Sequence, residues 1–156
     1  MEGGMISPEF LAKFSYSISS LREDNLNKFM EYYAEDATFN DPLHTLKGKD
    51  KIDSMYKAMY TRLEDARFGN LEIVKMENTI VVRWLFTFTV KRIKTGNQFP
   101  GVSWIALNEE NLIKSHTDFW DASELISLVT PMKYPINWIK KQISKLPKKT
   151  IKYEDN

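Results

Sequence analysis

The sequence contains no cysteine in its 156 residues. Disulfide bonds, thiol nucleophiles and cysteine-ligated zinc sites are therefore excluded. An excess of one charge is also missing, because 22 Lys and Arg residues stand against 21 Asp and Glu residues. A nucleic-acid-binding domain usually shows a strong basic excess, so we expect no nucleic-acid partner.

Long apolar runs and several well-known motifs are absent too. No stretch reaches the roughly 18 consecutive apolar residues of a transmembrane helix, and the first residues lack the charged-then-apolar pattern of a signal peptide. We therefore expect a cytoplasmic protein without a membrane partner. Glycine-rich phosphate loops and the G-x-S-x-G nucleophile elbow do not occur either.

The chain contains enough apolar residues to form one hydrophobic core. Hydrophobic residues make up 42% of the chain and aromatic residues 13%, which suits a single folded domain of this length. We expect this domain to span residues 7–130. A C-terminal helix and a polar, lysine-rich tail are expected over residues 131–156.

The first part of the chain shows helical periodicity. A serine and a proline open a helix that is predicted over residues 8–21. A second, short helix is expected at 24–33, and the most regular stripe predicts a third at 52–63. Between them, residues 36–42 are predicted to form a short strand that ends at a proline.

The middle of the chain is typical of antiparallel strands. Residues 70–76, 79–91, 101–107 and 112–121 are rich in β-branched and aromatic side chains, and short turns separate the last three. Helices followed by strands, without regular βαβ alternation, predict an α+β fold.

Helical periodicity returns near the C-terminus. Isoleucines are expected to line one face of a final helix, with lysines beside them: Ile136, Ile139 and Ile143, and Lys140, Lys141 and Lys145. This basic helix could contact an anionic surface, although such a charge pattern more often marks a solvated face.

The most unusual segment is residues 115–121, S-H-T-D-F-W-D. Alternation along a strand puts His116, Asp118 and Trp120 on one face. A histidine and a carboxylate two residues apart could share a proton or orient a water. They could equally form a structural hydrogen bond on the sheet.

A second carboxylate of interest, Asp41, precedes Pro42 at the end of the predicted short strand. It could act chemically, or it could bond its own turn backbone as turn aspartates often do. His44 follows, and a metal site would need His44, His116 and carboxylates together. Because no typical metal-binding spacing occurs, we expect neither a metal nor another cofactor.

Three stretches resemble the SnoaL-like members of the NTF2-like superfamily. Residues 33–42 read Y-A-E-D-A-T-F-N-D-P and are followed by Gly48 and Ile52, similar to the family's Y-A-x-D-A-x-F-x-D-P … G-x-x-x-I. Residues 111–116 resemble its G-K-I-x-x-H, and residues 116–121 its H-x-D-x-W-D. The resemblance covers roughly residues 10–125.

The resemblance implies a cone-shaped, curved antiparallel sheet wrapped around the N-terminal helices. An apolar cavity would open at one end of the cone, and the C-terminal helix would be an addition to it. The family also implies a homodimer that packs through the sheet. Its members include polyketide cyclases, ketosteroid isomerases and limonene-epoxide hydrolases.

The resemblance also assigns roles to two carboxylates. Asp41 matches the catalytic base of the isomerases, and Asp118 matches a catalytic aspartate on the last strand of the epoxide hydrolases. His116 would then relay or orient a proton inside the cavity.

Two departures separate the chain from these enzymes. Ser17 and Ser103 stand where the isomerases carry the tyrosine and the aspartate of their oxyanion hole, and Tyr16, one position away, is expected to point elsewhere. Residues 83–86 read R-W-L-F and lack the Arg-x-Asp pair of the hydrolases. Neither complete scheme is therefore expected.

Two functions remain open at this point. The first is a cofactor-free acid–base enzyme of the isomerase, cyclase or hydrolase class, acting on an apolar carbonyl or polyketide- or terpenoid-like compound. Its catalytic residues would be Asp41, His116 and Asp118, and its substrate contacts Tyr33, Trp84, Phe88, Ser103 and Trp120. The second is a non-catalytic ligand-binding or dimeric scaffold domain, in which these polar groups only satisfy one another.

Overall fold

A computed structural model describes residues 6–92, 94–128 and 132–145. They fall into two compact units that divide between Asp121 and Ala122, and each is described by itself. The first unit contains a six-stranded sheet with helices against it. The second contains α4 (Ala122–Ile126) and α5 (Lys133–Ser144). Among the described residues, no helix combines the length and the apolar character needed to cross a membrane.

The first helix begins at Pro8 as predicted, whereas the helix predicted at 52–63 begins earlier, at Lys49. The Ser7 hydroxyl accepts the backbone N–H of Phe10 at 3.1 Å and caps the first helix, and Pro8 occupies its first turn. Gly48, with φ of 100°, supplies the left-handed turn before the most regular helix. The helices of the first unit are α1 (Pro8–Ser19), a 3-10 turn η1 (Glu23–Asn25), α2 (Leu26–Met30) and α3 (Lys49–Arg62).

The sheet has the strand order β2-β1-β6-β5-β4-β3. Its strands are β1 (Tyr33–Asn40), β2 (Thr45–Lys47), β3 (Leu63–Met76), β4 (Thr79–Val90), β5 (Thr95–Leu107) and β6 (Ile113–Trp120). The antiparallel series from β4 to β6 confirms the predicted one. The pairing of β1 with β6 is parallel, and it sets Phe39 beside His116.

Several element boundaries differ from those expected. β1 begins at Tyr33, so this residue lies in a strand and its prediction as part of the second helix was wrong. β2 was not predicted, and β3 and β5 begin earlier than the sequence indicated. The pairing of β5 with β6 ends at Gly101 and Trp120, and Pro100 of β5 lies outside this paired stretch. Proline has no backbone N–H, and its absence here removes no hydrogen bond to β6.

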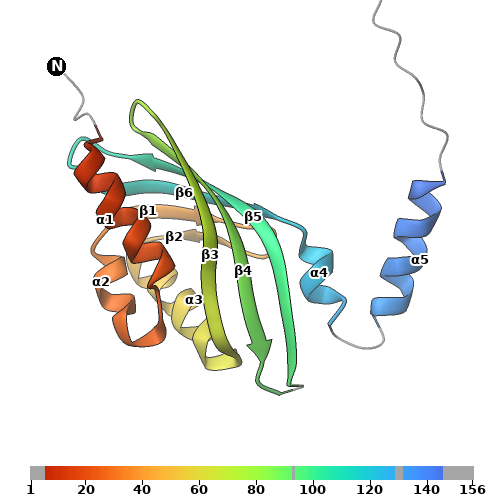
Figure 1. Cartoon of the computed structure of the whole chain (residues 1–156). Coiled ribbons are helices and arrows are strands. Elements are labelled where there is room, and N and C mark those ends of the chain that lie inside the picture. Colours follow the sequence, from red (N-terminus) through yellow and green to blue (C-terminus); the bar gives the residue numbers. More distant parts are fainter. Residues whose placement is uncertain (1–5, 93, 129–131, 146–156) are drawn as a thin grey trace, which may run out of the picture. The chain divides into compact units, whose positions relative to one another are not determined.

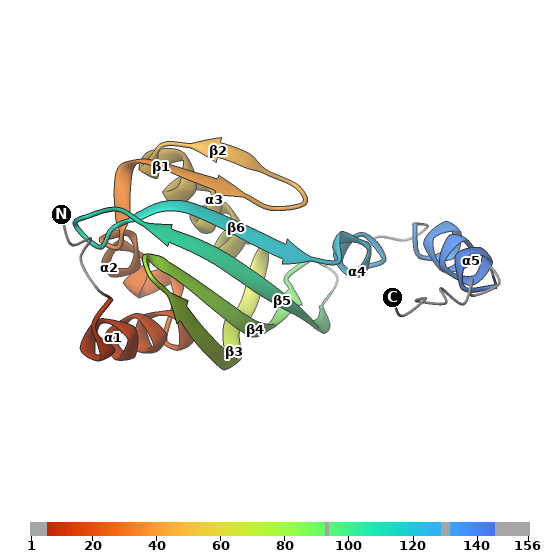
Figure 2. The same ribbon diagram turned by 90° about the horizontal axis from the view of Figure 1, so that it is seen from above.

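The sheet is strongly curved, and β3 to β6 curl around α1, α2 and α3 (Figures 1 and 2). Register shifts interrupt the pairing of β3 with β4, and such irregularities increase bending and twist. The concave face and the helices enclose the core, whose largest fully buried side chains include Phe14, Leu21, Tyr33, Phe39 and Ile52. This α+β architecture confirms the predicted fold class.

The opposite, convex face of the sheet carries exposed apolar side chains. Phe119 of β6 pairs with Val102 of β5, and Trp104 of β5 pairs with Val81 of β4. Phe119 and Trp104 are 59% and 47% exposed. Alternation explains this arrangement, because Asp118 and Ser103, their neighbours in sequence, point to the concave side.

Candidate functional site

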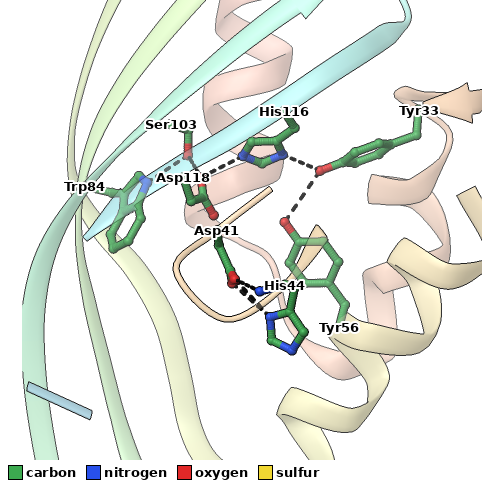
Figure 3. A network of polar contacts seen from close by, with 8 residues as sticks. All are labelled: Tyr33, Asp41, His44, Tyr56, Trp84, Ser103, His116 and Asp118. Carbon is green, nitrogen blue, oxygen red and sulfur yellow. Dashed lines mark hydrogen bonds and ion pairs between the residues drawn. The ribbon is translucent and has the colours of Figure 1, made fainter. Parts of the chain in front are cut away.

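A chain of hydrogen bonds runs across the concave side of the sheet (Figure 3). The Trp84 indole N–H donates to the Ser103 hydroxyl at 2.8 Å, and Ser103 donates to Asp118 Oδ1 at 2.5 Å. His116 Nε2 lies 2.8 Å from the same Oδ1. On its other side, His116 Nδ1 lies 2.6 Å from the Tyr33 hydroxyl. Five of the predicted site residues are thus joined.

Strand register explains the half of this network around Asp118. Ser103 and Asp118 are direct partners on β5 and β6, a position in which side chains on one face come within contact. Trp84 pairs with Gly101, two residues before Ser103. A Cβ at Gly101 would lie 2.1 Å from the Trp84 ring, so only glycine lets the indole cross this strand to reach Ser103.

The other half of the network depends on the parallel pairing of β1 with β6. This pairing brings Tyr33 of β1 to His116, and the Phe39 ring packs edge-on against the imidazole at 5.0 Å between centroids. Tyr56 of α3 extends the chain, with its hydroxyl 3.5 Å from that of Tyr33. Tyr56 lies in the helix predicted at 52–63 but was not among the predicted site residues. A tyrosine within the apolar stripe of that helix was the available signal.

The donors in this network all point toward the Asp118 carboxylate. An ionised carboxylate only accepts hydrogen bonds, so a neutral His116 carries its proton on Nε2, and Nδ1 accepts from the Tyr33 hydroxyl. Asp118 Oδ1 therefore receives both Ser103 and His116. Within residues 6–92, 94–128 and 132–145, no hydrogen bond to Oδ2 is found. The Asp118 side chain is 13% exposed.

The tyrosines at the inner end of the network are fully enclosed. Burial raises the pKa of the Tyr33 phenol far above its ordinary value, and burial likewise raises the pKa of Tyr56. Both phenols therefore stay protonated at neutral pH and can donate hydrogen bonds.

Asp41 lies outside this network. Its Oδ1 accepts the backbone N–H groups of Leu43 and His44 at 2.7 and 2.6 Å, and the His44 ring stands 3.0 Å away. This is the turn-stabilising arrangement that was the alternative for Asp41. Among the described residues, no hydrogen bond or ion pair joins Asp41 to His116 or Asp118. Figure 3 shows its carboxylate directed to His44.

The last two predicted contacts, Phe88 and Trp120, belong to an aromatic cluster rather than to the hydrogen-bonded chain. Phe88 packs on Phe86 and Phe99, and Trp120 stacks on Phe99 with centroids 5.0 Å apart. Phe99 was not among the predicted site residues, although it is the ring that links the two.

Two surface hollows lie away from Asp118 and His116. One, of about 500 Å³, is formed at the β3–β5 end by residues that include Arg67, Phe88 and Gln98. The other, of about 900 Å³, lies against α1 and α2. Neither hollow is lined by the hydrogen-bonded chain, so an apolar cavity over Asp118 stays a prediction.

Ser17 and Ser103, the positions that correspond to the isomerase oxyanion hole, have different hydrogen-bond partners. The Ser17 hydroxyl bonds the carbonyl of Phe14 within α1, and Tyr16 is 73% exposed, as expected for a side chain that points elsewhere. Ser103 does join the site, as a partner of Asp118. Among the described residues, no cluster of three or more His, Asp or Glu side chains is arranged to hold a metal ion.

The profile of the SnoaL-like domain family matches residues 16–116. The chain belongs to the SnoaL-like domain family. The match includes Tyr33, Asp41, Ser103 and His116, and it ends two residues before Asp118. No curated protein shows significant sequence similarity to this SnoaL-like chain.

Solved structures with the SnoaL-like fold include a candidate polyketide cyclase from Pseudomonas putida, with a TM-score of 0.69 and 10% identity over 81% of this chain and 100% of that one. A hypothetical protein with a ketosteroid isomerase-like fold from Catenulispora acidiphila, in complex with trimethylamine, has a TM-score of 0.64 and 16% identity over 76% of this chain and 89% of that one. An NTF2-like protein from Burkholderia pseudomallei has a TM-score of 0.67 and 17% identity over 76% and 96%. At such identities the likeness concerns the fold alone.

Proposed function

We propose that the protein is a cofactor-free acid–base enzyme of the isomerase or cyclase type, with Asp118 as its base. Its substrate would be an apolar carbonyl compound of the polyketide or terpenoid kind. The observation that carries the proposal is the bonding of Asp118: two donors hold Oδ1, while Oδ2 has no partner among the described residues.

The two oxygens of Asp118 suit different tasks. Ser103 and His116 fix the plane of the carboxylate, because both donate to the same atom. Oδ2 is then the atom that can take a proton from a substrate carbon next to a carbonyl group. With a β,γ-unsaturated carbonyl substrate, the electron pair of the broken C–H bond moves toward the carbonyl oxygen and gives a dienolate. Return of the proton from Oδ2 to the γ-carbon would re-form the C=O bond, shift the C=C bond into conjugation with it and complete an isomerisation.

His116 and Tyr33 act on this base indirectly. His116 directs its Nε2–H to Oδ1, which fixes the tautomer, and the Tyr33 hydroxyl, 2.6 Å from Nδ1, donates to that nitrogen and holds the ring in place. These two are positioning residues in the proposal. The aromatic rings of Trp84, Phe88 and Trp120 would border the apolar part of a substrate.

Asp41 has a different role in this proposal from the one its sequence position implies. Its carboxylate already accepts two backbone N–H groups and faces His44. We therefore assign it to holding the loop between β1 and β2 beside the site.

The proposal is tested by hydrogen–deuterium exchange. Apolar ketones are incubated with the protein in heavy water, and NMR follows loss of the protons next to the carbonyl group. Asp118→Asn keeps an oxygen for Ser103 and His116 but removes the base, so exchange should fall by roughly 10²–10⁴-fold. Asp36→Asn removes an exposed carboxylate of β1 and is the matched control.

The outcome also shows whether Asp118 or Asp41 is the base. Undiminished exchange in Asp118→Asn would refute the assignment, and a loss confined to Asp41→Asn would move the base to Asp41. Tyr33→Phe should leave the base in place but change the 15N shift of His116 Nδ1, which reports the loss of its hydrogen bond.

The second candidate is a ligand-binding or scaffold domain without catalysis. It is favoured by the position of the hollows, because neither is lined by Asp118 or His116. A thermal-shift screen of apolar ligands separates the candidates, since a ligand of the native state raises the melting temperature. Ligands that stabilise wild type and Asp118→Asn equally, without proton exchange in wild type, would favour this second reading.

We also propose that a second copy of the chain covers the convex face of the sheet. The apolar band of Phe119, Val102, Trp104 and Val81 crosses three strands and is exposed at its two large rings. Phe119→Lys should shift sedimentation from dimer to monomer. A wild type that sediments as a monomer at all concentrations would exclude this interface.

A further inference from the structure

Both ring nitrogens of His116 have hydrogen-bond partners inside the fold. The residue is 4% exposed, and its Nε2 and Nδ1 lie 2.8 Å from Asp118 Oδ1 and 2.6 Å from the Tyr33 hydroxyl. An imidazolium donates from both nitrogens, whereas a neutral ring donates from one and accepts at the other. The Asp118 carboxylate accepts from Nε2 in either state. Whether His116 can carry a charge here therefore depends on Tyr33.

The Tyr33 hydroxyl suits both states of the ring. It can donate to a bare Nδ1, or it can accept from a protonated Nδ1 and turn its own proton away. Figure 3 shows the Tyr56 oxygen in a second direction from this hydroxyl, 3.5 Å away, as an atom to which the proton can turn. Burial raises the pKa of the Tyr33 phenol far above its ordinary value. The phenol therefore meets a charged ring as a neutral acceptor and not as an anion.

We propose that His116 is a pH switch on the base, and that Tyr33 is the hydrogen-bond partner that permits its charging. The inference rests on the proposed function, because it concerns the activity of Asp118. As pH falls, Nδ1 takes up a proton, the Tyr33 hydroxyl changes from donor to acceptor, and a cation stands beside Asp118 Oδ1. A neighbouring positive charge stabilises the ionised carboxylate and so weakens it as a base.

The groups packed around His116 leave Asp118 as its charged neighbour. Its partners across the sheet are the apolar Ile105 of β5 and Phe39 of β1. Burial raises the pKa of Tyr56, which reaches the network from α3, so this phenol stays neutral. Among the described residues, no side chain other than Asp118 forms an ion pair with His116. The charge on the ring therefore acts chiefly on the base.

The test is a pH titration followed by 15N NMR, which distinguishes a neutral imidazole from an imidazolium. The chain contains two histidines, so a His44→Gln background leaves the ring of His116 alone to be observed. This ring should charge reversibly as pH is lowered, while circular dichroism shows the protein still folded.

The rate of ketone exchange should fall with the same midpoint as the charging of His116. A positive charge beside the carboxylate weakens the base by roughly one to three powers of ten. About half of such a change, on a logarithmic scale, reaches the rate of proton transfer. The exchange rate should therefore fall by roughly 3- to 30-fold between the neutral and the charged state of the ring.

Tyr33→Phe tests the reversible hydroxyl. Without its oxygen, a protonated Nδ1 would be a buried donor that has lost its acceptor, so charging of His116 should need a pH lower by about one unit. The fall in exchange rate should move with it. Tyr16→Phe removes a hydroxyl from a residue of α1 that is 73% exposed. It is the matched control and should move neither midpoint.

The proposal is overturned if exchange is lost at low pH while the His116 ring stays neutral, because the proton would then be on Asp118 itself. It is also overturned if the protein unfolds before the ring charges, or if Tyr33→Phe leaves the midpoint of the ring unchanged. Failure of the proposed function gives a different result, which is no exchange at any pH or undiminished exchange in Asp118→Asn. The ring titration needs no substrate, so it tests the charging of His116 in that case too.

Discussion

Gly101 is the residue on which the arrangement around Asp118 most directly depends. The Trp84 ring lies over this glycine, and a Cβ there would stand 2.1, 2.4 and 2.6 Å from three ring carbons. Trp84 is buried, so its ring has little room to yield. Gly101→Ala should therefore displace the indole and break its 2.8 Å hydrogen bond to Ser103.

The expected cost follows from three contributions. Overpacking of a core costs about 1–3 kcal/mol, and loss of the indole–hydroxyl bond about 0.5–1.5 kcal/mol. Replacing glycine by alanine recovers about 0.4–1 kcal/mol through the unfolded chain. A net loss of about 2 kcal/mol remains. For a chain of this length, it should lower the melting temperature by roughly 4–8 °C.

The assay is urea unfolding together with near-ultraviolet circular dichroism of the tryptophans. Gly69→Ala is the matched control, because nothing lies within 4 Å of a Cβ at that strand position; its stability should be unchanged or slightly higher. In a double-mutant cycle, Trp84→Phe should relieve part of the Gly101→Ala cost. A Gly101→Ala protein as stable as Gly69→Ala would refute this account of the site.

Three further predictions concern other polar groups. The buried Tyr60 hydroxyl has no hydrogen-bond partner among the described residues, so Tyr60→Phe should leave the free energy of unfolding unchanged or raise it by about 1 kcal/mol; a marked loss in urea unfolding would contradict this. Burial raises the pKa of Tyr60 to about 12, and it also raises the pKa values of Tyr33 and Tyr56. The folded state thus holds these protons more tightly, so their contribution to stability is complete below the unfolded pKa near 10 and is lost as pH rises above it. Unfolding measured from pH 9 to 12 should show this loss, with a shallower fall in Tyr60→Phe; equal slopes would count against it. Asp41→Ala should lower the free energy of unfolding by about 1–2 kcal/mol, because two backbone N–H groups lose their acceptor. Asp41→Asn keeps an acceptor oxygen and should lower it less. Equal losses for the two variants in urea unfolding would show that the loop does not depend on these two hydrogen bonds.

Local patterns determined much of the fold. Helical spacing and the Ser7-Pro8 signal located α1, and β-rich runs with short turns located the series β4 to β6. Alternation along β6 also put His116 and Asp118 on one face, and they are bonded there. These features depend on neighbours in sequence, which is why the sequence alone could predict them.

The partners of that pair were decided by the tertiary structure. The parallel pairing of β1 with β6 joins residues 83 positions apart and brings Tyr33 to His116. Tyr33 itself was predicted in a helix, because its apolar spacing fits a helix as well as a strand. Gly101, which lets Trp84 reach Ser103, was read only as the start of a strand. A single sequence shows which residues alternate, but register and the space beside a glycine exist only once the strands are paired.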